Sequence, residues 1–205
     1  MNDQTRKTVQ EAAREVPVVA KSDVVVVGGG PAGIGAAVSA ARNGASVTVL
    51  ERYPHLGGMA SGGMVLVLDD MINGPEITVT GVMTEYIDRM EKIGAAITPP
   101  MEDRVVSQEM WQKWSRWGVH DFHQPTKPQP IVYATAFDPD GFKRVANDLM
   151  VENNINLRLH SWFSSTIVED GKAVGVICET KRGRQAIMGD VIIDASGDLD
   201  VAVSA

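Results

Sequence analysis

A glycine-rich turn between two apolar runs constrains this 205-residue chain more than any other feature. Residues 24–27 are consecutive valines, the pattern of a parallel strand that is buried on both faces. They run into Gly28-x-Gly30-x-x-Gly33, after which small residues recur at helical spacing. A second apolar run, 46–50, follows that stretch. The pattern predicts a strand, a tight turn, a closely packed helix and a second parallel strand.

Each part of this unit has a role in binding a dinucleotide. Gly28 permits the tight turn, Gly30 lets the backbone approach a pyrophosphate, and Gly33 lets the helix pack closely on the strand. The helix N-terminus offers free N–H groups and a partial positive charge. Glu51, at the end of the second strand, is placed to accept hydrogen bonds from ribose hydroxyls, and its charge disfavours a 2′-phosphate. We therefore expect a dinucleotide site, with an ordinary glycine-rich turn as the alternative.

Composition excludes several classes of partner. The formal net charge of −7 argues against nucleic acid and against an anionic membrane, since both require clustered positive charge. The single cysteine, Cys178, rules out an internal disulfide and favours a reducing compartment. No apolar run reaches the length that spans a bilayer, and the first residues lack the apolar core of a signal peptide. We expect a cytoplasmic protein with no membrane or nucleic-acid partner.

The second half of the sequence predicts one long helix and several strands. Apolar spacing after Asp138-Pro139 indicates a helix that stops at Asn153-Asn154. Three runs between 162 and 188, joined by tight turns, indicate a three-stranded antiparallel β-meander, laid across the parallel sheet. An apolar strand then begins at Asp190. These elements predict an α/β fold: a Rossmann-like domain with a parallel sheet, helices on both faces and the β-meander.

A segment rich in tryptophan and proline interrupts this pattern at about residues 95–130. Three tryptophans recur every third residue from Trp111, which indicates a helix with a packing face; a wall facing substrate or flavin is the alternative. His120-x-x-His123 has too few neighbouring ligands for a metal site, so we expect none. Acid or base chemistry by either histidine stays open.

Four stretches of the sequence together carry a family resemblance. They are DVVVVGGGPAGIGAA with VTVLER; LGGMASGGMV; the run from FDPDGFKRVANDLM through the meander; and VIIDASGDLDVA. They resemble the FAD-dependent oxidoreductases with a glutathione-reductase-like FAD-binding fold, in their N-terminal FAD-binding part only. The last stretch is similar to that family's second flavin signature, D-A-[TS]-G-D. The resemblance implies non-covalent FAD, an appendage at residues 1–20 and an FAD-binding domain at 21–205 that carries the insertion.

The resemblance also implies a role for each residue that matches a motif. The expected site has a pyrophosphate turn, an adenosine end, a loop leading along the pyrophosphate and ribityl chain toward the flavin ring, and a signature turn packed beneath the FAD. In that order the residues are Gly28, Gly30, Pro31, Ala32 and Gly33; Glu51, Arg52 and, through its backbone, Phe163; Gly57, Gly58 and Met59; and Ala195, Ser196, Gly197 and Asp198.

The resemblance further implies an oxidoreductase in which a small organic substrate delivers hydride to the flavin. No catalytic residue is identified, and His120, His123 and Tyr133 are the candidates. Members of the family continue well beyond the signature, whereas this chain ends at Ala205. We therefore expect either a fragment or an FAD-binding subunit that a companion polypeptide completes; a homo-oligomer and a flavin-free NAD-binding module are further alternatives.

Overall fold

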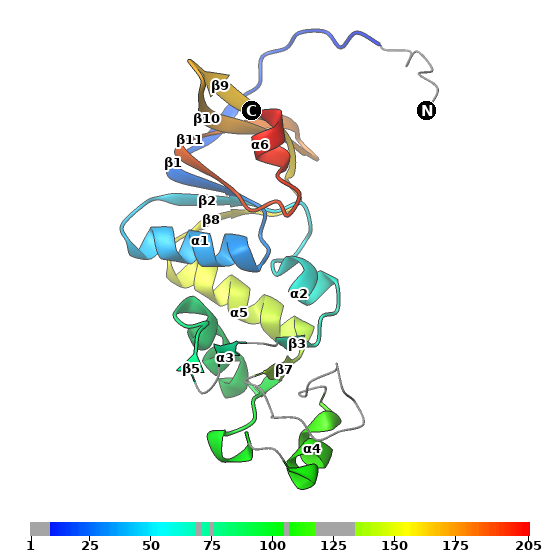
Figure 1. Ribbon diagram of the computed structural model, residues 1–205. Helices are drawn as coiled ribbons and strands as arrows, with labels where there is room; N and C mark the ends of the chain where they lie inside the picture. Colours follow the sequence, from blue (N-terminus) through cyan, green and yellow to red (C-terminus); the bar gives the residue numbers. More distant parts are fainter. Residues whose placement is uncertain (1–8, 69–70, 74–75, 105–106, 118–133) are drawn as a thin grey trace.

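The computed structural model describes residues 9–68, 71–73, 76–104, 107–117 and 134–205, and Figure 1 shows their arrangement. The largest sheet has six strands in the order β8-β2-β1-β11-β10-β9. In chain order these strands are β1 (Val18–Val27), β2 (Val47–Leu50), β8 (Asn156–Arg158), β9 (Trp162–Glu169), β10 (Lys172–Thr180) and β11 (Gly183–Asp194). Strands β8, β2, β1 and β11 are parallel, and β10 pairs antiparallel with both β11 and β9. The predicted parallel sheet is confirmed.

The valine run forms the central part of β1, and its side chains alternate between two cores. Val24 and Val26 belong to the apolar core on one face of the sheet, whereas Val25 and Val27 belong to the core on the other face. This explains why the run shows no polar alternation, because both faces are covered. β1 begins before the valines, at Val18, since its first half pairs with β11 alone.

Helices cover both faces of this sheet, as the sequence predicted. One face carries α1 (Pro31–Arg42), α3 (Val82–Lys92) and α5 (Pro139–Glu152), whose apolar side chains share one core with β1 and β2. On the other face lies the short helix α6 (Asp200–Ser204), whose Val201 packs into the second core. Figure 1 shows α1 and α5 below β2 and β8, and α6 beside β10 and β11. No helix in the described part of the chain is long and apolar enough to cross a bilayer.

The β-meander is present, but it is hydrogen-bonded into the parallel sheet and does not lie across it. The sequence suggested two strands, one on each side of Gly189. In the structure β11 runs through Gly189 without a break, pairing with β10 at its start and with β1 along its length. A Cβ on Gly189 would lie 2.7 Å from Val25 Cγ2, so the glycine permits close contact between β11 and β1.

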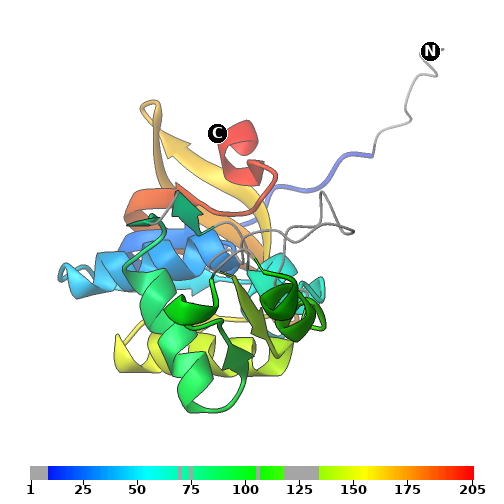
Figure 2. The same ribbon diagram turned by 60° about the horizontal axis from the view of Figure 1, so that its bottom comes forward.

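The start of the insertion contributes one strand, β6, to a second, smaller sheet. This sheet has the order β3-β7-β6, formed by β3 (Val67–Leu68), β7 (Thr135–Phe137) and β6 (Ala96–Ile97). The other elements are α2 (Gly58–Gly62), β4 (Ile72–Asn73), β5 (Glu76–Ile77), a 3₁₀ turn (Met101–Asp103) and α4 (Gln108–Ser115), and Figure 2 shows them from a second direction.

One tryptophan of the predicted packing face anchors α4. Trp114 is buried among Ala134, Ala136 and partly buried neighbours, and its Nε1–H donates to Asp103 Oδ2 at 2.9 Å. The packing interpretation of the tryptophan pattern is therefore confirmed for Trp114, whereas Trp117 is 42% exposed. The candidate residues His120, His123 and Tyr133 lie outside the described residues.

An ion-pair network joins α1, α3 and α5, the three helices that share one core with β1 and β2. Glu85 on α3 accepts hydrogen bonds from Arg42 on α1, at 2.7 and 2.9 Å, and from Arg89, at 3.0 Å. Arg89 in turn donates to Glu152 on α5. The hydrogen bond from Arg42, with that from Arg89, lowers the pKa of Glu85 to about 2 against the opposing effect of partial burial.

We expect the substitution Glu85→Gln to lower stability in a pH-dependent way. The pKa of Glu85 falls from an ordinary 4.5 to about 2 on folding, so the carboxylate stabilises the fold above pH 4.5. That contribution disappears as the pH falls from 4.5 toward 2. At neutral pH the variant should lose about 1 kcal/mol of unfolding free energy, the scale of a partly exposed network.

Urea unfolding at pH 7 and at pH 3 measures this effect. The difference between wild type and Glu85→Gln should shrink at the lower pH, and Glu91→Gln, at an exposed position of the same helix, should behave like wild type at both. A difference that stays constant with pH would contradict the assignment.

Candidate functional site

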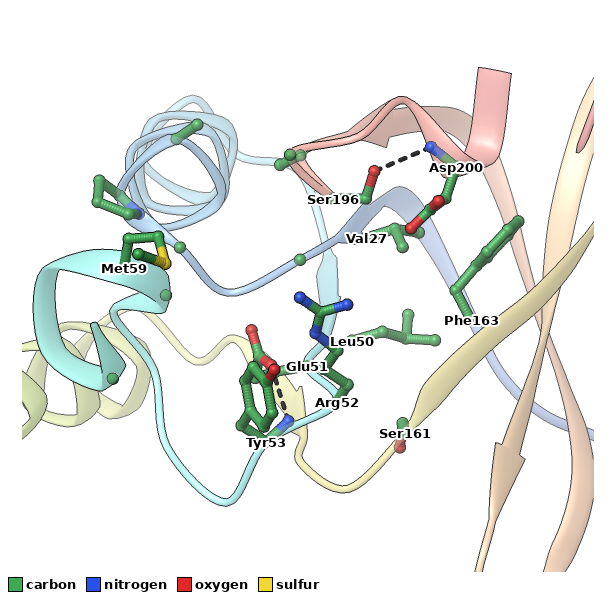
Figure 3. A pocket seen from close by; sticks show the side chains of 18 of the residues that line it. Val27, Leu50, Glu51, Arg52, Tyr53, Met59, Ser161, Phe163, Ser196 and Asp200 are labelled. Carbon is green, nitrogen blue, oxygen red and sulfur yellow. Dashed lines mark hydrogen bonds between the residues drawn. The ribbon is translucent and has the colours of Figure 1, made fainter. Parts of the chain in front are cut away.

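A pocket of about 620 Å³ lies where the parallel strands β1, β2 and β11 reach their carboxyl ends (Figure 3). Ligands of open α/β sheets collect at this edge. Its lining comprises the ends of these strands, the loop into α2, the start of β9 and the start of α6. These residues are Val27, Gly28, Gly30, Pro31, Ala32, Leu50, Glu51, Arg52, Tyr53, His55, Gly58, Met59, Gly62, Gly63, Ser161, Trp162, Phe163, Ala195, Ser196, Gly197 and Asp200.

The glycine turn brings three backbone segments closer together than side chains would allow. Gly28 has a φ of +106°, and a Cβ there would lie 2.2 Å from the carbonyl oxygen of Ala195. A Cβ on Gly33 would lie 1.8 Å from the carbonyl oxygen of Gly28. In the described part of the chain, no side chain caps the N-terminus of α1 and its first turn carries no acidic residue. The helix therefore presents free N–H groups to the pocket, as an anionic ligand requires.

Glu51 is held rigidly at the end of β2. Its side chain is only 5% exposed, yet it lines the pocket. The oxygen Oε2 accepts from Gly29 N–H and Oε1 accepts from Tyr53 N–H, both at 2.8 Å. A carboxylate oxygen has two lone pairs, so each oxygen keeps one for a hydroxyl group of a ligand. The acid is oriented for this role before any ligand arrives.

An aromatic and cationic cluster forms the wall next to Glu51. The guanidinium carbon of Arg52 lies 4.9 Å from the ring centroid of Tyr53 and 5.5 Å from that of Trp162. Tyr53 and Trp162 are 43% and 53% exposed, so their rings are accessible at the mouth of the pocket. Figure 3 shows Phe163 at the start of the neighbouring strand. Such a surface suits a planar base, through stacking and cation–π contacts.

The loop after β2 packs directly on the glycine turn. Gly57 N–H donates to the carbonyl oxygen of Gly29 at 2.8 Å, and Gly57 has a φ of +108°. A Cβ on Gly58 would lie 3.0 Å from the Cα of Gly30. Met59 follows at the start of α2, 72% exposed and on the pocket lining. The loop thus extends the pocket from the glycine turn along α2.

The structure brings most of the predicted site residues to this pocket. In the described part of the chain, three of them fall outside its lining. Gly33 lies behind the turn, Gly57 packs against Ser61, and Asp198 is exposed. Asp200, two residues further on, lines the pocket. The assignment of the whole set to cofactor binding stays a prediction.

Sequence reasoning missed several lining residues, for different reasons. Tyr53 lies two residues after Glu51, so proximity along the chain could have found it. Trp162 and Ser161 line the pocket only because β9 begins beside the end of β2, where Ser161 N–H donates to the carbonyl oxygen of Glu51 at 2.9 Å. No local pattern signals that contact.

These residues fit the adenosine diphosphate part of a dinucleotide. The glycines let the turn, the start of α1 and the Ala195 segment pack closely, the free N–H groups of α1 suit the charge of a pyrophosphate, and Glu51 suits a ribose. Among the described residues, no group of three or more His, Cys, Asp or Glu side chains is placed to hold a metal ion.

Comparison with known proteins shows related sequences over most of the chain. Residues 23–205 match the family model described as FAD dependent oxidoreductase. The fumarate reductase (cytochrome) of Shewanella frigidimarina is 29% identical over 189 residues, which are 85% of this chain and 33% of that protein. An NADH oxidase of Thermoanaerobacter brockii is 49% identical over 53 residues, 26% of this chain and 8% of that protein. The chain thus spans about a third or less of the length of these relatives.

Solved structures share the fold at low sequence identity. L-Amino acid deaminase from Proteus myxofaciens superposes with a TM-score of 0.54 at 18% identity, over 93% of this chain and 48% of that one. THI4 from Thermovibrio ammonificans gives a TM-score of 0.52 at 17% identity, over 90% of this chain and 61% of that one. At these identities the likeness concerns the fold alone.

Proposed function

This chain belongs to the FAD dependent oxidoreductase family, with FAD as its cofactor, and from that premise we propose that the pocket at the ends of β1, β2 and β11 binds FAD non-covalently by its ADP half. The observation that carries the proposal is the convergence of the glycine turn, the fixed carboxylate of Glu51 and the signature turn at Ser196 on one pocket. The glycine turn and the D-A-S-G-D signature favour the glutathione-reductase-like form of the fold.

Each wall of the pocket has a proposed role. The first turn of α1 and Gly30 hold the pyrophosphate, Glu51 accepts from the ribose hydroxyls, and the cluster of Arg52 and Trp162 contacts the adenine. The loop at Met59 follows the chain of the cofactor toward the flavin ring. Bound FAD would accept a hydride from a small organic substrate. The proposed reaction is therefore the oxidation of that substrate or its reverse.

The substrate side of the site is proposed to come from further polypeptide. Met59, Met64 and Leu66, along the loop that leads away from the glycine turn, are 72%, 64% and 52% exposed. An apolar surface beside a ligand pocket is typical of a contact with more protein. We infer that a companion polypeptide, or a further part of the same protein, packs there and completes the flavin site.

Titration of the purified chain with FAD tests the first proposal. We expect bound flavin with a visible spectrum that survives gel filtration, and competition by ADP but not by riboflavin. A chain that binds NAD more tightly than FAD would overturn it in favour of the flavin-free NAD module. A second outcome concerns the companion polypeptide. If the chain alone is a monodisperse yellow protein that a substrate reduces, the proposal of a companion is overturned and the proposal of FAD binding stands.

A further inference from the structure

One carboxylate at the end of β11 ties the signature turn to α6. Asp194 Oδ1 accepts from the backbone N–H of Ser196 at 3.1 Å and from its hydroxyl at 2.7 Å. Asp194 Oδ2 accepts from the backbone N–H groups of Val201 and Ala202, both at 3.0 Å. These bonds use both oxygens fully, since an ionised carboxylate has about four acceptor positions. Asp194 therefore fixes two segments relative to each other.

The first of these segments is a wall of the pocket. Ala195, Ser196 and Gly197 line it, and Ala195 N–H donates to the carbonyl oxygen of Val27 at 2.9 Å. The carbonyl oxygen of Ala195 is the atom that a Cβ on Gly28 would meet at 2.2 Å. The backbones of the signature turn and the glycine turn are thus in close contact, so a shift of one turn displaces the other.

The second segment, α6, connects to β9, which also contributes to the lining of the pocket. The Ser196 hydroxyl accepts from Asp200 N–H at 3.0 Å, which places the start of α6 on the pocket. Thr166 Oγ1 on β9 donates to the carbonyl oxygen of Val201, and Thr166 N–H donates to Ser204 Oγ, both at 2.9 Å. β9 also carries Phe163 on the wall of the pocket. Asp194 is therefore bonded directly to the signature turn and is connected to β9 through α6.

The backbone between these segments needs outside support. Leu199 has a φ of +60°, a left-handed conformation that costs a residue with a Cβ about 1 kcal/mol. Its side chain is 62% exposed, so packing does not hold it there. Partial burial raises the pKa of Asp194, but the hydrogen bonds from Ser196, Ala202 and Val201 outweigh it, so its pKa lies below the ordinary value. The carboxylate is ionised at neutral pH, as an acceptor of these bonds must be.

We propose that Asp194 is a positioning residue for the cofactor. In the described part of the chain it does not line the pocket. Its carboxylate holds the signature turn and α6 in the arrangement that FAD binds, and α6 transmits this order to β9. This inference rests on the proposed FAD function of the pocket.

The test compares Asp194→Asn with a matched aspartate elsewhere. Asp23 on β1 accepts from the N–H and the hydroxyl of Ser46, both at 2.7 Å, and is not among the lining residues, so Asp23→Asn also breaks hydrogen bonds to a carboxylate. We expect Asp194→Asn to raise the dissociation constant for FAD about tenfold, whereas Asp23→Asn stays within about twofold of wild type. Both are measured at a temperature where circular dichroism shows folded protein. The visible circular dichroism of bound flavin should change in Asp194→Asn alone.

A second variant keeps the proposal falsifiable where Asp194→Asn does not fold. Thr166→Val preserves shape and Asp194, but removes the hydroxyl bond to α6, and should weaken FAD binding about threefold. Unchanged FAD affinity and flavin dichroism in Asp194→Asn, or in Thr166→Val when it alone folds, would overturn the inference. A wild-type chain that binds no FAD would instead overturn the proposed function, so the two failures are distinguishable.

Discussion

The substitution Gly33→Ala is expected to reduce FAD affinity about 100-fold and to lower the unfolding free energy by about 3 kcal/mol. A Cβ on Gly33 would lie 1.8 Å from the carbonyl oxygen of Gly28, and a backbone atom cannot move aside as the end of a flexible side chain can. The start of α1 must therefore shift away from β1. That shift moves the free N–H groups away from the place where Glu51 and the signature turn converge.

A second glycine on the same helix provides the matched control. Among the described residues, a Cβ on Gly35 would meet nothing within 4 Å. Because glycine is unfavourable inside a helix, Gly35→Ala should raise the unfolding free energy by about 0.5–1 kcal/mol and leave FAD affinity unchanged. Thermal unfolding and FAD titration of both variants measure these changes in stability and affinity. A Gly33→Ala protein with wild-type stability and affinity would show that the close approach of α1 to β1 is not required.

The part of the site that the sequence predicted is the part built from neighbours along the chain. Four valines, three glycines and Glu51 lie within one strand-helix-strand unit, where the period of the strand and the sterics of glycine leave few alternatives. The structure places that unit as expected, with Glu51 at the pocket.

What the sequence did not predict depends on contacts between distant segments. Gly189 suggested a break between two strands, but its place against Val25 depends on the register of β11 with β1, which a single sequence does not show. Trp162 reaches the pocket because β9 starts beside the end of β2. Asp194 is the first residue of the recognised D-A-[TS]-G-D signature, yet its role emerges only from the way α6 folds back over it.

Glu51→Gln is expected to weaken FAD binding about 100-fold, although glutamine has nearly the same shape. The two oxygens of Glu51 accept from Gly29 N–H and Tyr53 N–H, so an amide must turn its own NH₂ group toward one of these donors. A buried donor left without an acceptor costs about 1–3 kcal/mol. The variant also loses the charge that strengthens hydrogen bonds from the ribose hydroxyls.

Nucleotide competition separates these two effects. Wild type should bind ADP more tightly than its analogue with a phosphate on the 2′-hydroxyl, because the carboxylate repels that phosphate. Glu51→Gln should bind ADP more weakly and narrow the difference between the two nucleotides, while Glu169→Gln, at an exposed position at the end of β9, should match wild type. Equal affinity of wild type for both nucleotides would remove Glu51 from ribose recognition. A thermal shift with no change in nucleotide preference would restrict its role to holding Gly29 and Tyr53 in place.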